Sequence, residues 1–234
     1  MPRPAAVPEE DGEGILAVLF DIDGTLIDSG GAGARSWKLA FDDLYGIPAD
    51  IGMFSDAGMT DPEVGRLTFA HVIGHEPTGA ELARVMAKRL EHLRHTIAES
   101  EGYQVLDGVA ELLPRLTAEG YLLGLTTGGV EAAAHIKLER GGLNHFFSFG
   151  GYGSDSTDRT ELTRGAIERG GQVLGGSLEP RRALVVGDTP LDVSAAQAAG
   201  AVAVAVATGH FGLEQLRETG AEHVLGSLRE PLPL

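Results

Sequence analysis

Cysteine is absent from this chain of 234 residues, so neither disulfide bonds nor thiolate chemistry are available to it. Basic residues are also scarce, because 18 Lys and Arg stand against 34 Asp and Glu and give a formal net charge of -16. A protein that reads a nucleic-acid backbone normally carries a basic stripe, so no nucleic-acid partner is expected. No apolar run approaches the roughly 20 residues that span a bilayer. The Pro-rich, acidic residues 1–14 contain no signal-peptide core either, and we expect a cytoplasmic protein without a membrane partner.

Apolar residues make up 43% of the sequence, which is enough to bury one core and a smaller accessory domain. Residues 1–14 show no periodicity and are predicted to form a flexible N-terminal arm. Residues 30–100 are predicted to be helical. Apolar residues recur there at helical spacing over 34–45 and 78–98, and Asp61-Pro62 is a typical helix start.

Short apolar runs alternate with helical patterns elsewhere in the chain, beginning with the run from Ile15 to Phe20. After residue 107 the predicted strands are 121–126, 146–149, 183–186 and 202–206, and the predicted helices are 107–119, 131–140, 160–170 and 190–199. Such alternation is typical of parallel strands with right-handed crossovers. We therefore predict an α/β fold: a three-layer, Rossmann-like parallel sheet core of residues 15–29 and 101–234, with residues 30–100 inserted as a small all-helical domain.

Two acidic pairs follow predicted strands directly, in Asp21-Ile22-Asp23-Gly24-Thr25-Leu26 and in Gly187-Asp188-Thr189-Pro190-Leu191-Asp192. Ligands bind beyond the carboxyl ends of the strands in such sheets, so the two pairs are expected to share one site. Carboxylate oxygens suit Mg²⁺, a cation that would offset the repulsion between this acidic chain and a phosphate substrate. A carboxylate can also act as a nucleophile and form an acyl phosphate. The pattern indicates phosphoryl transfer.

Together these residues resemble the haloacid dehalogenase superfamily, in its phosphoglycolate phosphatase-like branch, over roughly residues 15–230. The first motif of that superfamily matches residues 21–26, and the fourth, GDxxxD, matches 187–192. Thr127 stands where the superfamily places its phosphate-binding Thr or Ser. The resemblance implies that the helical insertion is a cap domain closing over the site.

The resemblance also implies a role for each residue. Asp21 would attack phosphorus, and Asp23 would protonate the leaving oxygen and then activate water. Mg²⁺ would be held by the Asp21 carboxylate, the Asp23 main-chain carbonyl and Asp188, with Asp192 as a further ligand or as a residue that orients the others. Thr127, Gly128 and a basic residue would bind the transferring phosphoryl oxygens, Gly128 through its backbone N–H.

The sequence departs from the superfamily at the basic residue of the third motif, where Lys is usual. Arg159, just ahead of a predicted helix, fits that position, and a guanidinium can serve there with bidentate geometry. Lys137 is the alternative, but its place on the helix after Thr127 predicts that it faces solvent.

In the cap, Thr60 and Asp61 stand in a stretch that resembles the loop with which capped relatives inspect the leaving group, although they could merely start a helix. Arg35 and Arg66 could contact an anionic leaving group, but surface roles are expected for both.

The sequence therefore predicts a Mg²⁺-dependent phosphomonoester hydrolase, monomeric or homodimeric. Its substrate would be a small phosphorylated metabolite, phosphoglycolate-like or a sugar phosphate. The alternatives are a phosphomutase of the same superfamily and a noncatalytic phosphate-binding module.

Overall fold

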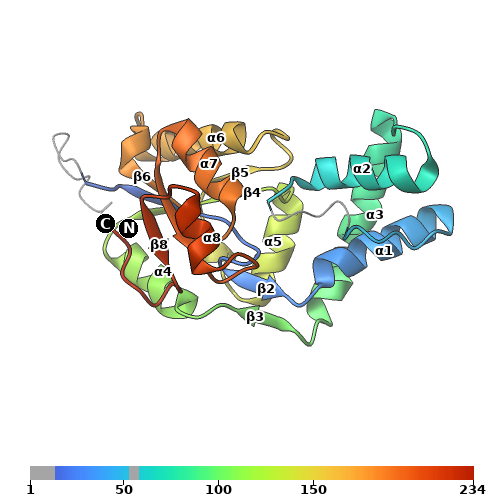
Figure 1. Cartoon of the computed structure of the whole chain (residues 1–234), viewed down its shortest axis with the longest axis horizontal. Coiled ribbons are helices and arrows are strands. Elements are labelled where there is room, and N and C mark those ends of the chain that lie inside the picture. The colour runs from blue at the N-terminus through green and yellow to red at the C-terminus, as the bar shows by residue number, and fades with distance from the viewer. Residues whose placement is uncertain (1–13, 53–57) are drawn as a thin grey trace, which may run out of the picture.

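The computed structural model describes residues 14–52 and 58–234. Most of the predicted N-terminal arm therefore lies outside the described residues. Figure 1 shows a sheet with helices on both faces and, to one side of it, a separate block of helices. Two thin connections, which contain β2 (Ile27–Ser29) and β3 (Tyr103–Val105), join the helical block to the sheet.

Six parallel strands form the sheet, in the order β5-β4-β1-β6-β7-β8. Phe20 at the end of β1 lies opposite Leu125 of β4 on one side and Val186 of β6 on the other. The strands are β1 Ala17–Phe20, β4 Leu122–Thr127, β5 Gly150–Tyr152, β6 Ala183–Gly187, β7 Val202–Val206 and β8 His223–Leu225. The predicted α/β class is confirmed, and β1 lies near the middle of the sheet.

Helices cover both faces of this sheet. Val18 and Phe20 pack into the apolar core that contains α4 (Val109–Ala118) and α5 (Glu131–Arg140). Ala17 and Leu19 pack into the core that contains α6 (Arg159–Leu174) and α7 (Pro190–Ala199). Successive side chains of a strand point to opposite faces, so the fully buried β1 supplies both layers. The remaining short elements are η1 Asn144–Phe146, η2 Pro180–Arg182 and α8 Leu213–Glu218.

The helical block consists of α1 (Ala32–Tyr45), α2 (Asp61–Ile73) and α3 (Gly79–Ala98). It has its own apolar core, in which Trp37 and Phe41 of α1 pack with Phe69 and Val85. Thr78 begins α3 with a capping box to Glu81, which satisfies backbone donors that the first turn leaves free. These helices confirm the helical reading of the insertion. No helix of the described ranges is long and apolar enough to cross a membrane.

The two connections pair with each other, which the sequence did not indicate. Strands β2 (Ile27–Ser29) and β3 (Tyr103–Val105) are antiparallel, with Asp28 opposite Gln104. Gly30 follows β2 with φ +59°, and a Cβ there would lie 2.5 Å from the carbonyl carbon of Gly102. Both the left-handed backbone and this close approach require glycine. The helical block is thus attached through a two-stranded ribbon.

The strand predicted at 146–149 is wrong. Residues Asn144–Phe146 form a short 3₁₀ turn, and the edge strand β5 begins at Gly150. Gly151 has no side chain, and a Cβ there would clash with the carbonyl group of Leu162 on α6. The close packing of α6 against the glycine backbone positions this strand, and β propensity does not predict such packing. The sequence analysis also missed β8 and α8, which have only three and six residues.

Candidate active site

A cavity of about 600 Å³ lies at the carboxyl ends of β1, β4 and β6, between the sheet and the helical block. Asp21 follows β1, Thr127 ends β4 and Asp188 follows β6. Carboxyl ends of adjacent parallel strands meet at one edge of a sheet, which explains why residues so distant in sequence converge. The cavity is lined by all of the predicted core residues except Asp192, namely Asp21, Asp23, Thr127, Gly128, Arg159 and Asp188.

Asp21 is only 7% exposed. Burial raises the pKa of its carboxyl group, the charge of Arg159 opposes that rise, and the charge of Asp23 adds to it. An Arg159 guanidinium nitrogen lies 3.5 Å from Asp21 Oδ1. A buried carboxylate beside a cation is well suited to act as a nucleophile.

Asp188 is 2% exposed and accepts a hydrogen bond from the Thr25 hydroxyl at 3.2 Å. Burial raises its pKa to about 7, and the nearby charge of Asp21 adds to the effect. Oxygens of Asp21, Asp188 and Asp192 lie within 4.8 Å of one another. Buried carboxylates this close repel one another, and a hard divalent cation with a preference for oxygen would relieve that repulsion. The donor set therefore fits Mg²⁺.

Asp192 differs from the other two because hydrogen bonds engage both of its oxygens. One accepts from Arg159, and the other accepts from the backbone N–H of Thr189 at 3.1 Å and its hydroxyl at 2.7 Å. These contacts complete the capping box of α7. The arrangement makes Asp192 a residue that fixes Arg159 and the start of α7.

Lys137 was predicted to face solvent, and this prediction is wrong. It is 6% exposed, and its Nζ donates to Oδ2 of Asp23. The reason is the packing of α5, which begins soon after β4 and turns one face toward the site. Lys137 lies one turn after Ala133, which is fully buried. That spacing is the only signal that could have placed Lys137 inside. The site therefore contains both basic residues that the sequence left as alternatives.

The loop after β4 packs closely against the start of α2. The backbone N–H of Gly129 donates to the Thr127 hydroxyl oxygen at 3.2 Å. The carbonyl of Gly128 accepts from the backbone N–H of Asp61 at 2.8 Å, and a Cβ on Gly128 would clash with the carbonyl oxygen of Met59. Glycine at 128 thus lets the start of α2 contact the loop.

Of the two predicted residues of the insertion, Asp61 lines the cavity and Thr60 does not. Asp61 Oδ2 accepts from Arg89 at 2.7 Å and from the backbone N–H of Val130 at 2.9 Å. Thr60 is buried just before α2. Sequence reasoning missed Arg89, a buried cation on α3. Its spacing was the available signal, because Arg89 lies four residues from both Val85 and Leu93, which are fully buried.

The two arginines named from the sequence as candidate contacts lie elsewhere. Arg66 forms salt bridges with Glu63 and Glu76, and Arg35 donates to the carbonyl of Gly30. Neither lines the cavity. The surface roles expected for both agree with these contacts.

The family model of haloacid dehalogenase-like hydrolases matches residues 15–200. The chain therefore belongs to the haloacid dehalogenase-like hydrolase family, and the resemblance seen in its motifs is confirmed. The phosphoglycolate phosphatase of Escherichia coli O157:H7 is 27% identical over 239 residues, covering 94% of this chain and 92% of the relative. Hexitol phosphatase A of Escherichia coli (strain K12) is 31% identical over 196 residues, covering 80% of this chain and 81% of the relative. These relatives support the predicted phosphatase activity.

Solved structures share the fold. CbbY from Rhodobacter sphaeroides, in complex with phosphate, matches with a TM-score of 0.73 at 21% identity, over 92% of this chain and 96% of that chain. The β-phosphoglucomutase of Clostridium difficile matches with a TM-score of 0.70 at 19% identity, over 92% of each chain.

Proposed function

We propose that this protein is a Mg²⁺-dependent phosphomonoester hydrolase that forms an aspartyl phosphate at Asp21. Its substrate is a small phosphorylated metabolite, phosphoglycolate-like or a sugar phosphate. The observation that carries the proposal is the buried Asp21 at the end of a central strand, with Asp23, Asp188 and the cations Lys137 and Arg159 in the same cavity. The phosphatases among its relatives support the same reaction class.

In the first step the Asp21 carboxylate attacks phosphorus, and the bond from phosphorus to the ester oxygen breaks. Asp23 gives its proton to that departing oxygen. The Thr127 hydroxyl and the guanidinium of Arg159 bind the transferring phosphoryl oxygens, which positions phosphorus for in-line attack. The product of this step is an acyl phosphate on Asp21 and a free alcohol.

In the second step Asp23, now ionised, takes a proton from water. The water oxygen attacks phosphorus, the acyl phosphate bond breaks, and Asp21 returns as a carboxylate. Lys137 donates a hydrogen bond to the Asp23 carboxylate and so holds the Asp23 oxygens in the cavity. Asp192 holds Arg159 in place.

Mg²⁺, bound through the Asp21 carboxylate, the Asp23 main-chain carbonyl and Asp188, would supply the positive charge that lets two anions approach each other. The helical insertion, residues 30–100, would act as a cap over the core of residues 15–29 and 101–234. The position of the cavity between the two supports this division.

The test is phosphate release from a panel of small phosphomonoesters, with Mg²⁺ and with a chelator, using Asp21→Asn as the matched control. We expect Mg²⁺-dependent release by the wild type and none by the variant. Isomerisation of a sugar phosphate without net phosphate release would select a phosphomutase instead. Binding of the esters by folded protein without any turnover would instead indicate a noncatalytic phosphate-binding module.

A further inference from the structure

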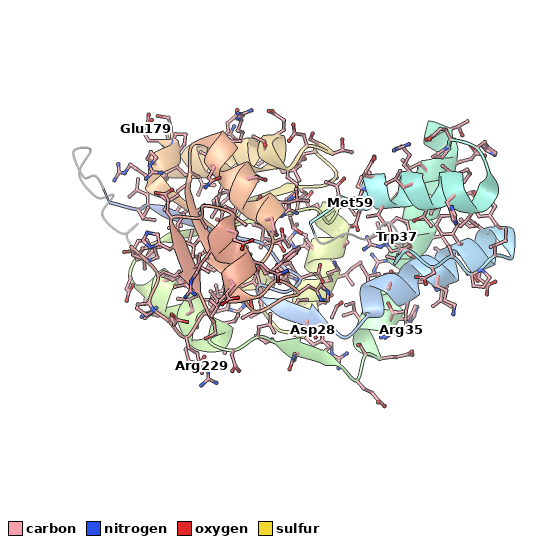
Figure 2. All side chains as sticks on the ribbon, in the orientation of Figure 1. Asp28, Arg35, Trp37, Met59, Glu179 and Arg229 are labelled. Carbon is pink, nitrogen blue, oxygen red and sulfur yellow. The ribbon has the colours of Figure 1, made fainter. Side chains whose placement is uncertain are left out.

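The loop after β7, residues 207–212, forms part of the wall of the active-site cavity. Three of its residues line the cavity, namely Thr208, Gly209 and His210, and none of the roles assigned so far uses them. β7 pairs with β6, so its carboxyl end meets the same edge of the sheet as the two acidic pairs. Met59, which Figure 2 shows between the helical block and the sheet, lines another part of the same cavity. The end of β7 therefore joins those of β1, β4 and β6 in forming the site.

Thr208 ties this loop to the turn after β1. Its hydroxyl donates to the backbone carbonyl of Gly24 at 2.6 Å. Gly24 directly follows Asp23, whose main-chain carbonyl is an expected Mg²⁺ ligand. It directly precedes Thr25, whose hydroxyl donates to Asp188. The contact made by Thr208 thus fixes the backbone that carries both of these groups.

Backbone from both segments also packs against the Asp188 carboxylate. A Cβ on Gly24 would clash with Oδ2 of Asp188, and so would a Cβ on Gly209. The Thr25 hydroxyl holds the other oxygen, Oδ1, at 3.2 Å. Thr208 immediately precedes Gly209 and bonds to Gly24, so its hydroxyl joins the two backbones that flank this carboxylate. The carboxylate has little freedom to turn while that contact is intact.

Such restraint matters because the carboxylates of this site repel one another in the absence of a cation. Asp188 is 2% exposed, and one of its oxygens lies within 4.8 Å of an oxygen of Asp21 and of Asp192. Like charges this close push the side chains apart unless surrounding groups hold them. Mg²⁺ requires nearly ideal octahedral geometry, so a carboxylate that turns away lowers the affinity for Mg²⁺. A residue that holds a ligand in place therefore contributes to metal binding without contacting the metal.

Resting on the proposed function, we infer that Thr208 is a positioning residue of the Mg²⁺ site. Its hydroxyl holds the turn after β1 against the loop after β7, and these two backbones set the direction of the Asp188 carboxylate. Thr208 lies outside both acidic motifs, and the pairing of β6 with β7 brings it to the site. Loss of the hydroxyl is therefore expected to weaken the binding of Mg²⁺ and to leave the binding of the ester at saturating Mg²⁺ unchanged.

Mg²⁺ binding to the protein without ester, measured by calorimetry, tests this role. Thr208→Val removes the hydroxyl at nearly constant volume and should weaken Mg²⁺ binding by about 10-fold, as expected for a residue that orients a metal ligand. Thr208→Ser keeps the hydroxyl and should bind Mg²⁺ nearly as tightly as the wild type. Thr117→Val is the matched control and should retain wild-type affinity, because the Thr117 hydroxyl donates to the Leu113 carbonyl within α4 and Thr117 does not line the cavity.

Steady-state kinetics adds a second readout. The Mg²⁺ concentration for half-maximal hydrolysis should rise about 10-fold in Thr208→Val, while KM for the ester at saturating Mg²⁺ stays at the wild-type value. A residue with only a structural role would lower Tm and leave the Mg²⁺ dependence unchanged. Thermal unfolding in chelator checks that each variant folds, and Thr208→Ala, which also lacks the hydroxyl, replaces Thr208→Val if the latter does not fold.

Equal Mg²⁺ binding by the wild type and Thr208→Val would overturn the inference, as would an equal loss of affinity in Thr208→Ser. Either result would leave the hydrolase proposal intact. If the wild type binds no Mg²⁺, both the Mg²⁺ dependence of the proposed function and the role of Thr208 are refuted. The expected differences in Mg²⁺ binding, in a protein that hydrolyses no ester, would support the role of Thr208 and refute the hydrolase proposal.

Discussion

Lys137 on α5 donates a hydrogen bond to the carboxylate of Asp23, 114 residues earlier in the chain. The pair brings a buried ammonium to the residue that is proposed to transfer protons. Asp23 itself is half-exposed, with 45% of its side chain accessible, so Lys137 restrains an otherwise free side chain. This contact adds a second cation to the Arg159 expected from the third motif.

We predict that Lys137→Met lowers kcat by roughly 10²-fold, the usual cost of removing one preorganised donor from such a site. The reason is that Asp23 would lose the contact that holds its carboxylate toward the reacting oxygen. Lys38→Met, at an exposed lysine on α1, is the matched control and should retain wild-type kcat. Steady-state kinetics on both variants, with thermal unfolding to confirm folding, measures the effect. Full activity in Lys137→Met would mean that the pair is only structural.

Gly128 and Gly129 offer a matched pair of substitutions in one loop. A Cβ at 128 would clash with the Met59 carbonyl, whereas the nearest atoms to a Cβ at 129 are Asp61 Oδ2 and Thr127 Oγ1, both at 3.6 Å, which is an ordinary contact. Gly128→Ala should therefore displace the loop from α2 and lower kcat/KM by about 10²-fold, since a misplacement of ~1 Å can cost that much. Gly129→Ala should lower kcat/KM much less. Similar losses in the two variants would contradict the proposed contact between the loop and α2.

The raised pKa of Asp188 makes the stability of the metal-free protein depend on pH. Its folded value of about 7 lies above its ordinary value of 3.8. Protonated Asp188 therefore contributes stability that is complete below about pH 4 and is lost as the pH rises through about 7. Burial raises the pKa of Asp21 in the same direction.

We accordingly predict that Asp188→Asn is more stable than the wild type in chelator at pH 8, and that the difference shrinks toward pH 5. Thermal unfolding across this range measures it, and a difference of several degrees is expected, because about 1 kcal/mol shifts Tm by roughly 2–4 °C at this size. Adding Mg²⁺ at pH 8 should raise the Tm of the wild type and not that of the variant. If the Tm values of the wild type and the variant changed with pH in parallel, the Asp188 carboxylate would not destabilise the metal-free fold.

Much of this arrangement could be predicted from sequence, for a physical reason. Asp21 and Asp188 each follow a short apolar run, and parallel strands bring such positions to one edge of a sheet whatever lies between them. Helices α5 and α7 were predicted with the boundaries that the structure shows, because caps and apolar spacing are local signals.

What could not be predicted depends on packing between distant segments. A single lysine or arginine on an amphipathic helix is usually predicted to be solvent-exposed, even where its spacing places it on the buried face. The partner across the interface, which the local sequence does not show, explains why it is buried. Lys137 meets Asp23, and Arg89 meets Asp61 and Trp37. The ribbon of β2 and β3 could not be predicted for the same reason, because each strand has only three residues and forms only by pairing with the other.

The central claim is that the phosphoryl group passes through Asp21, and trapping the intermediate tests it most directly. Asp23→Asn should still be phosphorylated by p-nitrophenyl phosphate, whose leaving group needs no proton, but should release phosphate slowly. Rapid acid quench followed by peptide mass spectrometry should then find a phosphoryl group on Asp21, with a burst of p-nitrophenolate equal to the enzyme present. A linear time course with no phosphorylated peptide, from an enzyme whose wild type hydrolyses the same ester, would contradict the account.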